Sequence, residues 1–311
     1  MRRVVVTGMG IVSSLGHSVD AAYERLKTPR NCVEVSEDLK GYRGLQTCLW
    51  APSRFERPAE YGRKVVRTMS PVSMMALFAT EQAIMQARLD DSGIIKGGRL
   101  GIAYGSCSGS VDANADFSSV LMEREVKNVT SATYIKMMSQ TCAVNLSVHF
   151  GTTGRLLPTG VACASGSLAI GQAYEAIKFG MQDVMIAGGA EEFSPTQVAV
   201  FDTLFATSRR NDDCGSTPRA FDVNRDGLVI GDGAATLILE EREHALARGA
   251  TILAEVAGFA TNTDGRHVTQ PNAETQAVVL QHALNDAKIS SSDIGYVNAH
   301  GTATDLGDIA E

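Results

Sequence analysis

The chain alternates short apolar runs rich in β-branched residues with longer amphipathic stretches, a pattern typical of an α/β protein with a mostly buried sheet. The pattern predicts a second compact unit that opens near residue 250, after the Gly249 stop. It predicts strands at residues 3–7, 99–104, 183–188, 234–239, 252–261 and 295–299. Helices are expected at residues 20–26, 71–87, 165–179, 241–248 and 274–287.

Composition places the protein among ordinary globular chains. Its 311 residues include 28 Lys plus Arg and 35 Asp plus Glu, so the formal net charge is −7. A hydrophobic fraction of 44% with 20% charged residues is far from the composition of disordered proteins. The acidic balance argues against bulk electrostatic binding to nucleic acid or to anionic membranes. An anionic partner would have to meet a local basic patch.

The first fifteen residues have the charge pattern of a signal peptide. However, the β-branched run Val4-Val5-Val6, closed by Thr7-Gly8-Met9-Gly10, favours a buried first strand and a tight turn. The longest uncharged stretch, residues 156–174, contains Pro158 and many small residues and is therefore not a spanning helix. We expect no membrane segment and a cytoplasmic protein.

The six cysteines are scattered along the chain without a C-x-x-C pair or a neighbouring histidine cluster. This distribution argues for reduced thiols and against a zinc or other metal site. Gly8-Met9-Gly10 follows a strand, but the dinucleotide fingerprint requires a third glycine where Ser13 stands, so a structural turn is the better interpretation.

Two cysteines are candidate nucleophiles. Cys107, in Gly105-Ser106-Cys107-Ser108-Gly109, has the form of a nucleophile elbow, although the residues from Val111 onward start no convincing apolar helix. Cys163 stands among very small residues just before a helix, where the helix N-terminus stabilises a thiolate. A buried structural cysteine is the alternative for Cys163.

His300 follows the last predicted strand and precedes Gly301, in the position where open α/β sheets place ligands. Thr302 and Thr304 add hydroxyl groups to the same segment. A structural histidine is the alternative.

Taken in order, these motifs resemble those of the β-ketoacyl-acyl carrier protein synthases, the condensing enzymes of the thiolase superfamily. The type I branch of bacterial fatty acid synthesis is the most similar, and polyketide and aryl polyene relatives share the motifs. The matching segments are VVVTGMGIVSSLG (4–16), RKVVRTMS (63–70), VACASGS (161–167), AGGAEE (187–192), AFDVNRDGLVIGDGA (220–234), EHALARGA (243–250) and HGTATDLGDIAE (300–311).

The resemblance implies a homodimer with a five-layered αβαβα fold built from two pseudo-symmetric halves. Residues 1–250 would form the N-terminal half with the nucleophilic cysteine, and residues 251–311 would begin the C-terminal half with the first catalytic histidine. The family continues with a lysine, a second catalytic histidine and a Phe-Gly-Phe-Gly-Gly-type loop, which do not occur in this sequence. We therefore expect the second half to be incomplete.

The resemblance also implies a mechanism. Cys163 would take an acyl group from a carrier protein, with its own backbone N–H as half of an oxyanion hole. His300 would stabilise the enolate formed when malonyl-acyl carrier protein loses carbon dioxide. The acyl chain arrives on the phosphopantetheine of acyl carrier protein, so no bound cofactor is expected.

Other positions match supporting residues of the family. Thr302 and Thr304 correspond to residues that hydrogen-bond the phosphopantetheine arm. Glu311 corresponds to an acid that orders the absent lysine, and without that partner it would be a solvated carboxylate. The expected docking patch for an acidic carrier protein comprises Arg63, Lys64, Arg67, Arg124 and Lys127.

This sequence departs from the family pattern at one place beside the acyl pocket, where type I members have a loop made almost entirely of glycine. Cys107 and Ser108 stand there, and their side chains would narrow or polarise the pocket in favour of shorter or more polar chains. Ser165 stands where threonine is common. Two rival hypotheses stay open: a non-catalytic partner subunit like a chain-length factor, and a hydrolase built on Cys107.

Overall fold

The computed structural model describes residues 1–90, 93–267 and 269–311. The chain divides into two compact units. Unit 1 comprises Met1–Thr28, Ser53–Glu192 and Asp232–Val256, and unit 2 comprises Pro29–Pro52, Phe193–Gly231 and Ala257–Glu311. Both units are thus assembled from segments far apart in the sequence. The division of the sequence into halves at residue 250 stays a prediction.

Unit 1 is built on a six-stranded mixed sheet with the strand order β5-β4-β6-β8-β1-β9. Strand β4 runs parallel to β5 and β6, whereas β8 runs antiparallel to β6 and β1, and β9 antiparallel to β1. The strands are β1 (Val4–Val12), β4 (Leu100–Gly105), β5 (Leu156–Thr159), β6 (Val184–Glu191), β8 (Gly233–Glu241) and β9 (Ala254–Val256).

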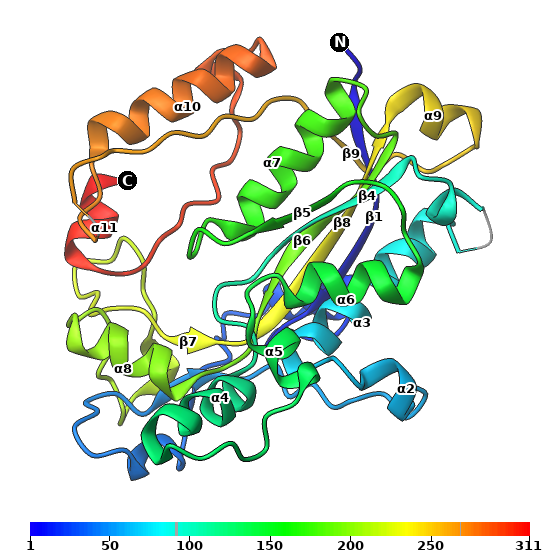
Figure 1. Cartoon of the computed structure of the whole chain (residues 1–311). Coiled ribbons are helices and arrows are strands. Elements are labelled where there is room, and N and C mark those ends of the chain that lie inside the picture. The colour runs from blue at the N-terminus through cyan, green and yellow to red at the C-terminus, as the bar shows by residue number, and fades with distance from the viewer. Residues whose placement is uncertain (91–92, 268) are drawn as a thin grey trace. The chain divides into compact units, whose positions relative to one another are not determined.

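Helices cover both faces of this sheet (Figure 1). Helices α3 (Pro71–Ala87) and α6 (Thr141–Phe150) pack on one face and α7 (Ser165–Lys178) on the other. This helix–sheet–helix layering within unit 1 confirms the predicted α/β class. The remaining helices of the unit are α1 (Val19–Leu26), α2 (Arg63–Val66), α4 (Val111–Glu123), α5 (Ser131–Met137) and α9 (Arg242–Ala247).

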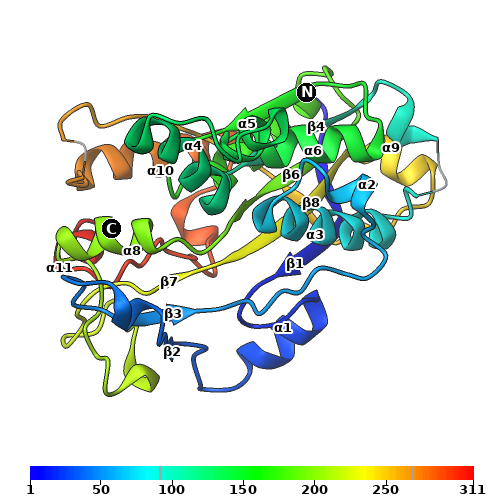
Figure 2. The same ribbon diagram turned by 60° about the horizontal axis from the view of Figure 1, so that its bottom comes forward.

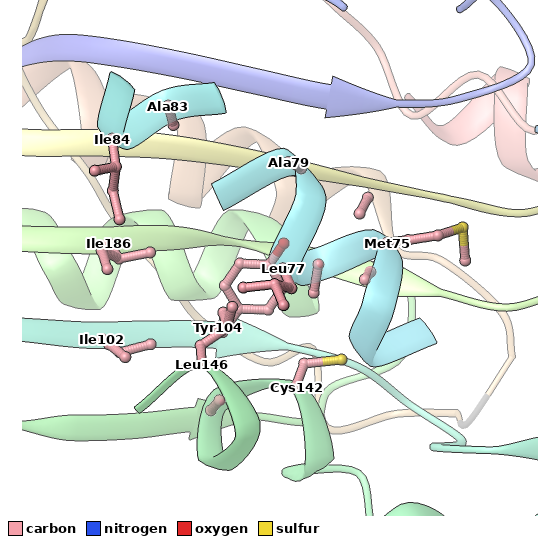
Figure 3. Close-up of a cluster of buried hydrophobic side chains, with 14 of the residues drawn as sticks. Met75, Leu77, Ala79, Ala83, Ile84, Ile102, Tyr104, Cys142, Leu146 and Ile186 are labelled. Atoms are coloured by element: carbon pink, nitrogen blue, oxygen red, sulfur yellow. The ribbon is translucent and has the colours of Figure 1, made fainter. Parts of the chain in front are cut away.

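Helix α3 buries most of its residues because it packs against both the sheet and α6. It begins with Pro71 at a position that needs no amide hydrogen, and its predicted bounds are confirmed. Leu77 is fully buried with Tyr104 of β4 and Ile186 of β6 (Figure 3). The Tyr104 hydroxyl meets the Thr236 hydroxyl at 3.0 Å, so this buried polar group is satisfied.

The glycines of β1 allow α3 to pack directly on the strand. The predicted turn at Thr7–Gly10 is wrong, because β1 runs on to Val12 with only a bulge after Val6. A Cβ atom at Gly8 or Gly10 would overlap a carbonyl oxygen of α3. These glycines therefore serve neither a dinucleotide nor a turn.

The starts of three strands of unit 1 are tied together by charge. Asp183, just before β6, accepts hydrogen bonds from Arg2 at 2.7 Å and from Arg99 at 2.7 and 2.9 Å. The Arg99 guanidinium, helped by Arg2, lowers the pKa of Asp183 to about 2. Because β4, β5 and β6 are parallel, their carboxyl ends meet at the opposite edge of the sheet.

Unit 2 holds a small sheet with the strand order β2-β3-β7 (Figure 2). Leu39, Cys48 and Val198 form its buried apolar cluster. Its strands are β2 (Glu34–Val35), β3 (Leu49–Ala51) and β7 (Ile230–Gly231), and its α-helices are α8 (Pro195–Thr203), α10 (Ala273–Ala287) and α11 (Asp305–Ala310).

Two predicted strands fail in the second part of the sequence. Only Ala254–Val256 of the stretch 252–261 is a strand, and residues 295–299 are extended without being one. Tyr296 and Val297 are 80% and 69% exposed. Apolar, β-branched composition becomes a strand only where a neighbouring strand pairs with the backbone, and among the described residues such pairing is found in these two stretches for Ala254–Val256 with β1.

The packing of β1 on α3 predicts that Gly10→Ala destabilises unit 1. The added methyl group must displace the backbone of α3, so we expect a loss of about 3 kcal/mol and a lower melting temperature by circular dichroism. Gly62→Ala is the matched control, since nothing lies within 4 Å of a Cβ atom there. Equal melting temperatures for the two variants would contradict this account of the packing.

Candidate active site

Strands β4, β5 and β6 of unit 1 end at the same edge of the sheet, and the residues at and after their ends lie there. The loop after β4 carries Cys107 and Ser108, the loop after β5 carries Cys163, and β6 itself ends at Glu191. Ligands in α/β proteins bind outside the carboxyl ends of parallel strands, so this edge is the candidate site.

Cys163 lies on a sharp turn between β5 and α7. Ala162, just before it, has a φ of 52°, in the left-handed region that a side chain disfavours. Cys163 is exposed, which rules out the alternative of a buried structural cysteine. The first turn of α7 follows immediately, so the unpaired N–H groups of a fourteen-residue helix lie next to this thiol.

Small residues let the N-terminus of α7 approach the sheet. A Cβ atom at Gly105 would lie 2.7 Å from the backbone carbon of Ser165, and one at Gly189 would lie 3.2 Å from the Cα atom of Gly166. Larger residues would push α7 and the Cys163 turn off the strand ends. Packing within unit 1 therefore requires Gly105 and Gly189 at the strand ends beside the Cys163 turn.

Cys107 lies beside the same turn, with its Sγ atom 3.7 Å from Ser165 Oγ. Its backbone N–H donates to Glu191 at 2.7 Å, and the Ser108 N–H donates to the same carboxylate at 3.4 Å. Burial raises the pKa of the Cys107 thiol. A raised pKa opposes nucleophilic activation.

The hydrolase hypothesis also fails on geometry. A nucleophile elbow passes directly into a helix, whereas three residues separate Cys107 from α4, which Ser110 caps. The expectation that no helix starts at Val111 is wrong, because the Ser110 cap and packing stabilise a weakly apolar helix. In the described part of the chain, no hydrogen bond or ion pair joins Cys107 to a histidine.

Glu192 is a supporting residue that the sequence did not single out. It is 6% exposed and accepts the N–H groups of Val72 at 2.9 Å and Val111 at 2.6 Å, at the starts of α3 and α4. Burial raises the pKa of both Glu191 and Glu192. The signal was present as two adjacent acids after an apolar strand, where solvated residues are not expected.

The His300 segment belongs to unit 2 and is a loop. Gly301 has a φ of 54°, so the chain turns sharply after the histidine. Glu311 accepts the N–H groups of His300 at 2.6 Å and Gly301 at 2.8 Å. Glu311 is exposed, as expected for a carboxylate without its lysine, and it also holds the turn in which His300 lies.

The two threonines after His300 form a second turn of unit 2. Their hydroxyl groups meet at 2.8 Å, and Thr304 caps α11 by accepting the Gly307 N–H at 3.1 Å. Asp308 of α11, 8% exposed, accepts the N–H of Ala303 at 3.0 Å. It also accepts the N–H of Phe221 at 2.6 Å, so one carboxylate joins two distant segments of unit 2.

The predicted basic residues of unit 1 lie in two places. Arg63 and Lys64 are exposed on α2, with Arg67 at its end, whereas Arg124 ends α4. Figures 1 and 2 both draw α2 and α4 apart. Lys127 pairs with Glu125 at 2.6 Å, which reduces its positive field. The three cations around α2 therefore form the stronger local patch.

The described residues contain neither a cluster of metal ligands nor a membrane-spanning helix. No group of three or more His, Cys, Asp and Glu side chains there is arranged to hold a metal ion. None of the helices in the described ranges combines the length and the apolar character needed to cross a membrane.

Comparison with known proteins shows the family. Residues 1–245 match the model for the N-terminal domain of β-ketoacyl synthases, and residues 253–311 match the model for the C-terminal domain. The 3-oxoacyl-[acyl-carrier-protein] synthase 2 of Vibrio harveyi is 36% identical over 317 residues, covering all of this chain and 75% of that protein.

Solved structures of similar proteins support the same family. A β-ketoacyl synthase from Burkholderia phymatum STM815 is 53% identical with a TM-score of 0.98, covering 100% of this chain and 76% of the other. A complex of a type II PKS acyl-carrier protein with its ketosynthase bound to the hexaketide is 30% identical with a TM-score of 0.86, over 99% of this chain and 75% of that one.

The chain therefore belongs to the β-ketoacyl synthase family and has its thiolase-like α/β fold. Its reaction class is that of the condensing acyltransferases of fatty acid or polyketide synthesis. It spans about three quarters of the length of the relatives named above.

The double role of Asp308 predicts that Asp308→Ala loosens the Thr302–Thr304 turn. The buried N–H of Ala303 would lose its acceptor, which costs about 1–3 kcal/mol, so its hydrogen exchange should accelerate by about 5- to 150-fold. Asp305→Ala is the control, because its side chain is 88% exposed on the same helix. Equal exchange rates of Ala303 in both variants would show that Asp308 does not hold the turn.

Proposed function

We propose that this chain condenses an acyl thioester with malonyl-acyl carrier protein, with Cys163 as the nucleophile and His300 as the group that stabilises the enolate. The observation that carries the proposal is the exposed Cys163 on a left-handed turn at the N-terminus of α7. The pathway is fatty acid elongation, or the related polyketide or aryl polyene synthesis.

The first step is transfer of the acyl group to Cys163. The helix N-terminus favours the thiolate over the thiol, and the thiolate attacks the thioester carbonyl of the acyl-carrier protein. A carbon–sulfur bond to Cys163 forms, and the bond to the carrier's phosphopantetheine sulfur breaks. The carrier leaves with a free thiol after it takes up a proton.

The oxyanion of this step needs a donor aimed at the carbonyl oxygen. The backbone N–H of Cys163 can supply one, because a turn with a left-handed residue beside a helix N-terminus points successive N–H groups outward. Because such a donor is already fixed in place, it lowers the activation barrier of acyl transfer without any rearrangement of the protein during the reaction.

The second step consumes malonyl-acyl carrier protein. Its carboxylate leaves as carbon dioxide, and the electron pair of the broken bond forms an enolate whose oxygen accepts a hydrogen bond from His300. The enolate carbon then attacks the Cys163 thioester, and the Cys163 thiolate leaves. The product is a 3-oxoacyl chain longer by two carbons. Glu311 keeps the His300 backbone in place for this step.

The carrier protein is the proposed partner. Thr302 and Thr304 offer hydroxyl groups to the phosphopantetheine arm, and the exposed cations of α2 suit an acidic carrier surface. Arg124 and Lys127 would contribute less. The related ketosynthase solved with its acyl-carrier protein supports this partnership. We propose further that the chain works as a cytoplasmic homodimer and needs no bound cofactor or metal.

Cys107 and Ser108 are proposed to line the acyl pocket. Both lie on the loop that Glu191 holds beside the Cys163 turn, and their polar side chains favour shorter or more polar acyl groups. A Ser108→Gly variant with an unchanged preference across a series of acyl lengths would remove this part of the proposal.

The test combines acylation and condensation. We expect peptide mass spectra of the natively expressed protein, incubated with acyl-loaded carrier protein, to show the acyl group on Cys163. Cys163→Ala should lose the adduct, and condensation should fall by about 10³-fold or more. His300→Ala should keep the adduct but yield no 3-oxoacyl product when malonyl-acyl carrier protein is added.

Three other outcomes would each contradict the proposal. An acyl group on Cys107 would favour the hydrolase hypothesis. No adduct at all would favour a non-catalytic partner subunit. Full condensation by His300→Ala would exclude the histidine from the second step while leaving Cys163 as the nucleophile.

A further inference from the structure

We infer that Ser165 is a positioning residue, whose hydroxyl group clamps the turn that presents Cys163. The inference rests on the proposed function, because it assigns Ser165 a role through the Cys163 nucleophile. Ser165 is 4% exposed, whereas the four residues before it, 161–164, are all exposed. The turn therefore has little packing of its own to fix it.

The Ser165 hydroxyl group bonds to both sides of the strained residue. Its Oγ atom accepts the N–H of Val161 at 2.8 Å and donates to the carbonyl oxygen of Ala162 at 2.7 Å. The Ser165 N–H donates to the same Ala162 carbonyl at 3.0 Å. One hydroxyl group therefore bridges the N–H of Val161, just before the left-handed Ala162, and the carbonyl group of Ala162 itself.

These hydrogen bonds matter because Ala162 is held in a backbone conformation that alanine disfavours. A left-handed alanine costs roughly 1–2 kcal/mol, and such a conformation persists only where the surroundings impose it. The hydroxyl bonds supply that constraint within unit 1. If they are lost, the turn can relax, and both the thiol and the backbone N–H of Cys163 move together.

The Ser165 residue is itself held in place from two strand ends. The Thr159 hydroxyl, at the end of β5, donates to the Ser165 carbonyl oxygen at 2.8 Å. Gly105, at the end of β4, allows the Ser165 backbone to lie against that strand. Cys107 Sγ adds a contact at 3.7 Å from the loop that Glu191 anchors.

The chemistry of the clamp restricts which residues can replace Ser165. The group must accept one hydrogen bond and donate another within a buried space, which a hydroxyl does and a methyl group does not. Threonine keeps the hydroxyl, and alanine removes it with little change in volume. Ser167, in the same first turn of α7 but exposed, offers the matched control.

The experiment compares Ser165→Ala, Ser165→Thr and Ser167→Ala in the natively expressed protein. We expect Ser165→Ala to lower kcat and the rate of Cys163 acylation by about 10–100-fold, with KM for the carrier protein within about twofold of the parent. Ser165→Thr should recover most of the rate, and Ser167→Ala should behave as the parent. A crystal structure of Ser165→Ala should show Ala162 outside the left-handed region.

The outcomes separate this inference from the proposed function. A parent protein that acylates Cys163, with Ser165→Ala equally fast, would overturn only the positioning role. A rate lost equally in Ser165→Ala and Ser165→Thr, or accompanied by unfolding, would overturn it as well, since a structural role alone would explain that result. A parent that forms no Cys163 adduct would overturn the proposed function, and the Ala162 conformation in the variant would still test the clamp.

Discussion

The close approach of the α7 N-terminus to the ends of β4 and β6 is the constraint on which the rest of the unit 1 site depends. It depends on Gly105 and Gly189, because a Cβ atom at either position would lie too close to the backbone at the start of α7. The approach brings the helix N-terminus to the carboxyl edge of the parallel strands. The short connection from β5 must then turn sharply, and Ala162 takes the left-handed conformation that exposes Cys163.

Acidic side chains hold backbone segments within each unit. In unit 1, Glu191 at the end of β6 and Glu192 just after it accept backbone N–H groups from the loop that follows β4 and from the starts of α3 and α4. Asp308 does the same between two segments of unit 2. A carboxylate that accepts several backbone donors fixes a loop without covering it, so the loop's outer surface stays available to substrate.

Structural features set by the residues of one short segment were predictable from the sequence. Features that depend on contacts between segments far apart in the sequence were not. Helix α3 has a proline start and a largely apolar sequence, and its bounds are confirmed. The segment 295–299 has equally good strand composition but is not a strand. Small residues before a helix indicated a sharp turn and a candidate nucleophile at Cys163 but left a buried cysteine as the alternative. The Ser165 clamp depends on which atoms the fold brings within hydrogen-bond distance.

Site-resolved alkylation tests most directly the central claim that Cys163 is the reactive thiol of the site. Cys107 and Cys163 are both exposed, but Cys163 lies beside a helix N-terminus, whereas partial burial of the Cys107 thiol and full burial of the Cys142 thiol raise their pKa values. The account predicts that limiting iodoacetamide at pH 7 modifies the Cys163 peptide first, well before that of Cys107. Modification of Cys107 at an equal or higher rate would contradict it.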